Sequence, residues 1–172
     1  MKSPSTLRVL ILTASLTALA ACGGDNAPAA DEGGDAAAPG EGSELSAAIS
    51  QRQDGFEAIG DAFKAIRGEL EGGSPDMAVI SEAATAMNEN AQKVGDLFPA
   101  GTSVDDGFET EALAVIWDKP EEFESKHKAL LDATAEMVTI AATGDAAAVK
   151  AQVGNVGLSC KGCHDTFRLD TD

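Results

Sequence analysis

Residues 45–70 read LSAAISQRQDGFEAIGDAFKAIRGEL, and the spacing of their apolar side chains decides the fold class. The intervals are mostly three or four residues, which places these side chains along one face of an α-helix. The series comprises Leu45, Ile49, Phe56, Ile59, Phe63, Ile66 and Leu70. Gly72-Gly73 follows at once, and glycine is favoured where a helix ends in a left-handed residue. The stretch therefore predicts one long amphipathic helix.

Three further segments, which follow this helix in the sequence, show the same periodicity. The second is expected to begin at Ser74-Pro75, a capping residue followed by proline at the first helical position. The second segment covers residues 74–98. The third consists of a short turn up to Trp117 and a long helix over residues 120–142. The fourth runs from Gly144-Asp145 to Phe167. Strand signals are nearly absent, since the chain has no Tyr and no alternating run of β-branched residues. We predict an all-α, antiparallel up-down four-helix bundle over residues 44–172.

The N-terminus predicts export and a lipid anchor. Residues 1–21 combine Lys2 and Arg8 with an apolar run that is typical of a signal peptide and too short to span a bilayer. Leu19-Ala20-Ala21-Cys22 resembles the bacterial lipobox, in which Cys22 becomes the lipidated first residue; the alternative is an ordinary cleavage site before an unrelated cysteine. Residues 22–43, rich in Gly, Ala and acids, are expected to form a disordered linker. We thus expect a protein anchored on the periplasmic side of a bacterial membrane.

The acidic composition restricts the partners. The chain has 29 Asp and Glu against 12 Lys and Arg, a net charge of −17. Cleavage after residue 21 removes two basic side chains and no acid, which makes the charge −19. Such a surface repels nucleic acid and is compatible with basic protein partners. With no phosphate-binding glycine loop and no hydrolase triad in the sequence, we do not expect enzymatic turnover.

The last apolar segment contains Cys160-Lys161-Gly162-Cys163-His164. Cys-x-x-Cys-His is the signature of c-type haem attachment. Residues i, i+3 and i+4 share a helix face, so two thiols can bond to the vinyl groups of one porphyrin edge while the imidazole ligates iron. The alternatives are a zinc site, which normally needs four ligands; a redox-active dithiol, which favours a βαβ context; and a structural disulfide. We predict one covalently attached haem c, bound through Cys160 and Cys163, with His164 as axial ligand.

Three features together resemble a known family. They are the C-terminal position of the stretch Cys160–Arg168, the pattern Arg52-Gln53-x-x-Phe56 in the first helix, and Leu97-Phe98-Pro99 followed by Ile116-Trp117. Over residues 44–170 the chain resembles the class II cytochromes c and, within them, the cytochrome c-prime family. The resemblance implies a haem-bearing four-helix bundle, and it leaves homodimerisation through the first two helices open.

The resemblance also implies roles for four residues. Arg52 and Gln53 are expected to meet a haem propionate, although Arg52 alternatively extends to the surface. Phe56 stands where low-spin relatives carry a methionine ligand, which implies five-coordinate, high-spin iron facing an apolar distal pocket. Arg168 is expected beside the proximal imidazole, or else is a plain surface arginine.

Other candidates near the haem have structural interpretations. Trp117 is expected to pack near the cofactor or in the general core. His127 is expected at the edge of the core rather than as a second axial ligand. Met77, Met87 and Met137 each fit a helical seam, which favours core packing over iron ligation.

The predicted function is that of a monohaem c-type cytochrome that transfers electrons to redox protein partners, binds small gases such as NO or CO, or does both. One alternative is a low-spin electron carrier with a sixth protein ligand. The other is a haem-free helical lipoprotein that acts as an interaction module.

Overall fold

The computed structural model describes residues 41–171, and four long helices account for most of them. They are α1 (Glu41–Glu71), α2 (Met77–Val94), α4 (Pro120–Ala141) and α5 (Ala146–Phe167), with the single turn α3 (Val115–Asp118) between α2 and α4. The predicted signal peptide, Cys22 and residues 22–40 of the predicted linker lie outside the described residues.

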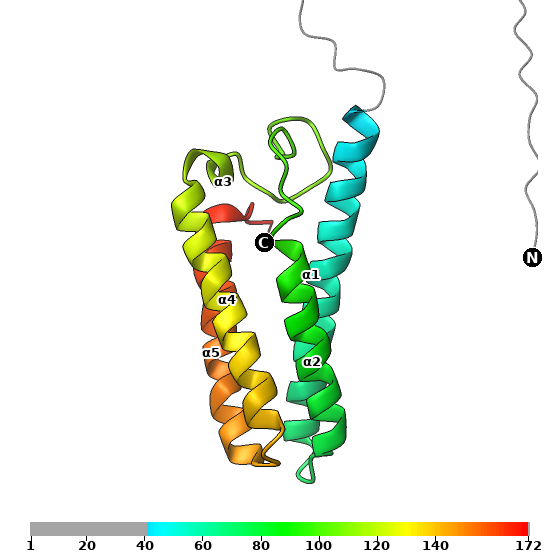
Figure 1. The fold of residues 1–172 in the computed structure, drawn as a ribbon, viewed down its shortest axis with the longest axis vertical. Helices are drawn as coiled ribbons and strands as arrows, with labels where there is room; N and C mark the ends of the chain where they lie inside the picture. The colour runs from blue at the N-terminus through cyan, green and yellow to red at the C-terminus, as the bar shows by residue number, and fades with distance from the viewer. Residues whose placement is uncertain (1–40, 172) are drawn as a thin grey trace, which may run out of the picture. The chain divides into compact units, whose positions relative to one another are not determined.

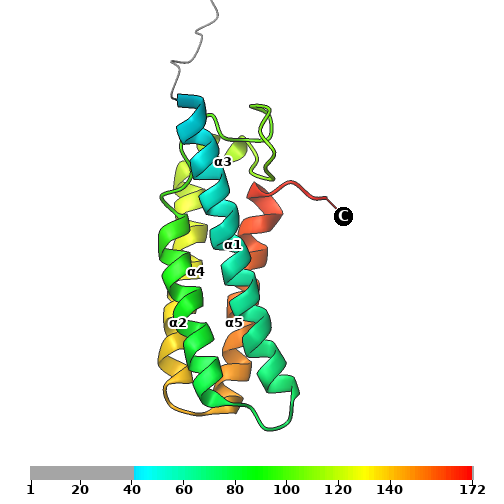
Figure 2. The same cartoon turned by 90° about the vertical axis from the view of Figure 1, so that its right-hand side faces the viewer.

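The helices form the predicted four-helix bundle. In Figure 1, α1 and α2 form one antiparallel pair and α4 and α5 the other, with α3 and the long α2–α3 connection at one end. The turned view of Figure 2 shows the same elongated bundle, with the two short connections together at the opposite end. None of the helices within residues 41–171 has the length and apolar character needed to cross a bilayer.

The core confirms the helical periodicity. Its largest fully buried side chains come from all four long helices and include Ile66, Ile80, Met87, Val94, Met137, Val149 and Val156. Met87 and Met137 have no exposed surface, and Met77 packs against this cluster from the edge. The prediction that these methionines serve core packing is therefore confirmed.

Two predicted helix boundaries are wrong at α2. The cap is Asp76 and not Ser74, and Pro75 lies before the helix and not at its first position. The carboxylate of Asp76 accepts hydrogen bonds from the backbone N–H groups of Ala78 and Val79, so it satisfies donors that have no partner inside the helix. The helix also ends at Val94, four residues before Phe98.

The other boundaries agree more closely. Asp145 caps α5 in the same way as Asp76 caps α2, by accepting from Ala147 and Ala148. Gly73 has a φ of +75°, the left-handed conformation expected just after α1. At its start, α1 extends to Glu41, three residues before the expected domain boundary at residue 44.

Candidate haem-binding site

A cavity of about 690 Å³ lies at the end of the bundle that carries α3, since Ile116 of α3 is among its lining residues. Its walls come from the middle of α1, the end of α2, the first half of α4, the last turns of α5 and residues 109–112. The volume lies within the range of small-molecule and cofactor sites in proteins. The cavity lining includes all the residues predicted to contact haem: Arg52, Gln53, Phe56, Cys160, Cys163, His164 and Arg168.

Both cysteines lie half-buried on α5 and are free thiols. Burial raises the pKa of Cys160, and burial followed by the charge of Cys160 raises the pKa of Cys163 to about 11. Both sulfurs are therefore neutral thiols at neutral pH. The structure holds no disulfide between them, which removes the support for the structural-disulfide interpretation.

The imidazole of His164 is suited to metal ligation. Burial, followed by the positive charge of Arg168, lowers the pKa of His164, so the neutral form that can donate a lone pair to iron is favoured. Within residues 41–171, no other His, Cys, Asp or Glu side chains gather with it into a group that could hold a bare metal ion. This finding gives the zinc interpretation no support.

An apolar wall of four phenyl rings borders the cavity. Phe56 contacts Phe98 edge-on with ring centroids 6.3 Å apart, Phe98 contacts Phe123 at 4.8 Å, and Phe123 contacts Phe167 at 5.4 Å. The four rings come from α1, the α2–α3 connection, α4 and α5. Phe56 is 37% exposed despite its size, because its ring borders the cavity instead of filling the core. Apolar walls, two thiols and an imidazole on one cavity fit a covalently bound porphyrin.

Arg52 is 2% exposed, so the alternative that its side chain extends to the surface is wrong. Its terminal nitrogens donate to the carbonyls of Leu97 and Thr102 and to the hydroxyls of Thr102 and Thr110. The guanidinium also lies 4.9 Å from the centre of the Phe98 ring. These partners explain how a charged group is tolerated at a core-facing position. The guanidinium thus ties α1 to the α2–α3 connection.

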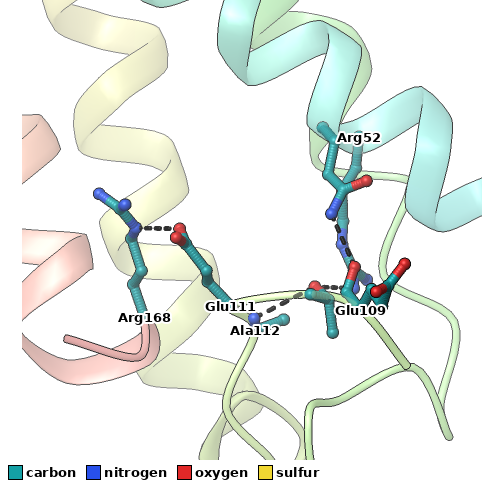
Figure 3. Close-up of polar contacts among 7 residues, drawn as sticks. Arg52, Glu109, Glu111, Ala112 and Arg168 are labelled. Atoms are coloured by element: carbon teal, nitrogen blue, oxygen red, sulfur yellow. Dashed lines mark hydrogen bonds and ion pairs between the residues drawn. The ribbon is translucent and has the colours of Figure 1, made fainter. Parts of the chain in front are cut away.

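Residues 109–113, which we call the bridging segment, run between α1 and the end of α5 (Figure 3). On the α1 side, the amide of Gln53 donates to the carbonyl of Glu109 at 2.9 Å. On the α5 side, Nε of Arg168 donates to Oε2 of Glu111 at 2.5 Å. Glu111 could not be found from the sequence, because the segment has no periodicity and its partner lies 57 residues away.

His127 and Trp117 have structural contacts close to the cavity. Nε2 of His127 lies 2.8 Å from the carbonyl oxygen of Ala91, which agrees with a histidine at the edge of the core. Its ring also lines the cavity and lies against Gly95. The indole of Trp117 donates to the carbonyl of Phe98 at 3.1 Å and packs with Ile116 behind the cavity wall.

Comparison with known proteins identifies the family. The model of the family described as Cytochrome C′ matches residues 47–168, which is most of the chain and contains every residue of the predicted haem site. The chain belongs to the cytochrome c′ family. Cytochrome c′ of Pararhodospirillum photometricum is 33% identical over 121 residues, which cover 70% of this chain and 94% of that protein.

Solved cytochrome c′ structures share the fold. Cytochrome c prime from Shewanella frigidimarina is 35% identical, with a TM-score of 0.68 over 73% of this chain and 97% of that chain. A nitric oxide complex of a mutant of cytochrome c prime from Alcaligenes xylosoxidans is 26% identical, with a TM-score of 0.66 over 73% and 97%. A cytochrome c′ with ligand-controlled dimer dissociation is 29% identical, with a TM-score of 0.68 over the same shares.

Family membership defines the cofactor and the broad function. A member of the cytochrome c′ family carries one haem c per chain, attached covalently, and this chain presents Cys160 and Cys163 at the required spacing. This chain therefore functions as a c-type haem protein like cytochrome c′.

Proposed function

We propose that this chain binds a small neutral gas such as NO or CO at a five-coordinate haem iron. Cys160 and Cys163 hold the porphyrin, His164 is the one protein ligand, and Phe56 borders the distal pocket. The proposal rests on one observation: these two thiols, the imidazole and the phenyl ring line the same cavity. It is supported by the nitric oxide complex of the Alcaligenes xylosoxidans relative.

The protein side chains determine what can reach the site. Haem supplies an iron that changes oxidation state and takes an axial ligand. A phenyl ring has no lone pair for iron, and the apolar wall around it disfavours water and anions, which lose hydration there. Arg52 retains its Nε–H and Gln53 its second amide hydrogen beyond the bonds described above, and we propose that these donors meet a haem propionate.

An optical spectrum tests this assignment. We expect the reduced protein to be high-spin and to change its spectrum on addition of CO. A low-spin spectrum without response to CO would overturn gas binding and support the alternative, a dedicated electron carrier with a sixth protein ligand. Met87 and Met137 are buried in the core away from the cavity, so His127 is the described side chain best placed for that role.

Covalent attachment is tested separately. After expression with the haem-attachment machinery, a haem-stained band should survive boiling in denaturant. Replacing both Cys160 and Cys163 with Ser should abolish the band, whereas Ser at Cys22 should leave it intact. A wild-type protein without stain would leave only the haem-free interaction module.

We further propose that the chain is a lipoprotein on the periplasmic side of a bacterial membrane, anchored through Cys22. The support is the sequence Leu19-Ala20-Ala21-Cys22 after a charged and apolar leader. Metabolic labelling with palmitate should mark the wild type and fail with Cys22→Ser. Cys160→Ser, the matched control, should retain the label, and equal labelling of all three proteins would reject the anchor.

Redox proteins are the proposed partners, with basic ones favoured by the net charge of −17. A second copy of the chain is a further proposed partner, supported by the dimer-forming relative. Sedimentation of the reduced protein with and without CO tests this: a single monomeric species under both conditions would reject the dimer.

A further inference from the structure

The turn of α5 that carries His164 is held from outside the helix. Arg168 donates its backbone N–H to the carbonyl of His164 at 3.2 Å, closing the last turn. Beyond that turn, Leu113 donates to the carbonyl of Phe167 at 3.1 Å and Leu169 to that of Glu111 at 2.7 Å. These two bonds flank an antiparallel bridge between Ala112 and Arg168. The bridging segment therefore pairs with the end of α5 through one isolated antiparallel β-bridge.

The side chain of Glu111 reinforces this pairing. Its Oε2 accepts from Nε of Arg168 at 2.5 Å, and the two side chains are 45% and 46% exposed (Figure 3). A hydrogen bond between charged groups is stronger than a neutral one. It joins residues that are 57 positions apart, so it closes a long-range contact that the helix cannot provide by itself.

No comparable side-chain hydrogen bond within residues 41–171 holds the imidazole of His164 itself. His164 makes no side-chain hydrogen bond to any residue in the described range 41–171. In most metal sites, a hydrogen bond from the second ring nitrogen fixes the orientation of the histidine. Here the orientation depends on the backbone turn, and that turn depends on the bridging segment.

We propose that Glu111 is a positioning residue for the axial ligand: it holds Arg168 and the last turn of α5 against residues 109–113, and thereby fixes His164. This rests on the proposed function, in which His164 ligates iron. The other end of the same segment is held by Gln53 and by Arg52, which donates to Thr110 at 2.8 Å, one turn before Phe56. The segment thus connects the helix bearing the distal residue to the turn bearing the proximal one.

The test compares Glu111→Gln with Asp165→Asn in the haem-loaded protein. Asp165 forms an equally short ion pair with Lys161, at 2.5 Å, and lies next to His164, but that pair stays within α5. Both variants remove one negative charge, so only the contact with the bridging segment distinguishes them. The first readout is the iron–histidine stretching band of the reduced protein in resonance Raman spectra. The second is hydrogen–deuterium exchange of residues 109–113 and 167–171.

We expect Glu111→Gln to broaden the iron–histidine band and shift it to lower frequency, and to speed exchange in both segments about two- to fivefold. Asp165→Asn should change neither. Exchanging the charges, with Glu111→Arg and Arg168→Glu together, should restore both readouts. An unchanged band in Glu111→Gln, or an equal change in Asp165→Asn, would overturn the inference. A wild-type protein with no iron–histidine band would instead overturn the proposed function.

Discussion

Under the proposed function, the side chain at position 56 separates a gas-binding haem from a low-spin electron carrier. The ring of Phe56 borders the cavity, with 37% of its surface exposed and an edge-on contact to Phe98 as its aromatic partner. Under the proposed function, a side chain at this position reaches the space on the distal side of the haem. Its chemistry would then determine whether iron gains a sixth ligand.

Phe56→Met should convert the haem to a low-spin form that no longer binds CO, because a thioether sulfur can ligate iron and a phenyl ring cannot. The absorption spectra of the oxidised and reduced protein, with and without CO, measure this. Phe63→Met is the matched control: it lies two turns further along α1, packs on the main core and does not line the cavity. If both variants stay high-spin, Phe56 does not face the iron.

The absence of a side chain at Gly95 allows the imidazole of His127, which lines the cavity, to pack against the backbone there. A Cβ at this position would lie 2.3 Å from Cε1 of His127, and the imidazole is already held by the carbonyl of Ala91. Gly95→Ala should therefore lower the free energy of unfolding by roughly 1–3 kcal/mol, as measured by urea denaturation. Gly154→Ala, where a Cβ meets nothing within 4 Å, should instead raise it by about 0.5–1 kcal/mol. Destabilisation of equal size in both variants would contradict the steric reason.

At the scale of the elements, α5 carries the haem motif at one end and a strong cap at the other. Asp145 accepts from the backbone of Ala147 and Ala148, so Asp145→Ala should cost about 1 kcal/mol of unfolding free energy. Asp105→Ala is the control, since this exposed carboxylate makes no hydrogen bond or ion pair with residues 41–171. Urea denaturation of both variants measures the difference. A loss in Asp105→Ala as large as in Asp145→Ala would show that charge and not capping is responsible.

The helices were predictable because their signal is local. Most side chains at every third or fourth position along α1, α4 and α5 are apolar, and that pattern alone indicates a buried face. The cap at Asp76 was missed because Ser74-Pro75 offers an equally good local pattern two residues earlier. Only the observed hydrogen bonds to Ala78 and Val79 distinguish the two starts.

The α2–α3 connection was not predictable, because its structure depends on contacts distant in sequence. Arg52 organises it by donating to Thr102, 50 residues away, and to Thr110, 58 residues away. The sequence indicated that Arg52 occupies a core-facing position and needs an acceptor. It did not indicate that backbone carbonyls and threonine hydroxyls accept the hydrogen bonds of its terminal nitrogens. The same reasoning applies to Glu111 and Arg168, which meet only once the bundle has formed.

At the scale of the whole molecule, charge is the dominant feature outside the core. The net charge of −17 attracts cations and repels anions over distances set by ionic strength. The cavity lining itself is balanced, with Glu57, Glu109 and Glu111 against Arg52, Lys126 and Arg168, so the excess of acids lies on the rest of the molecule. Encounters with small redox partners at this end of the bundle should therefore depend on the sign of the partner's charge.

Two small oxidants of opposite charge test this directly. Oxidation of the reduced protein by hexaammineruthenium(III), a cation, should slow as salt rises from about 10 to 200 mM, since the Debye length falls from about 30 Å to below 10 Å. Oxidation by ferricyanide, an anion, should become faster over the same range, because salt screens its repulsion. Stopped-flow absorbance measures both rates, and each oxidant is the control for the other. If both rates respond to salt in the same direction, the net charge does not control access to the haem.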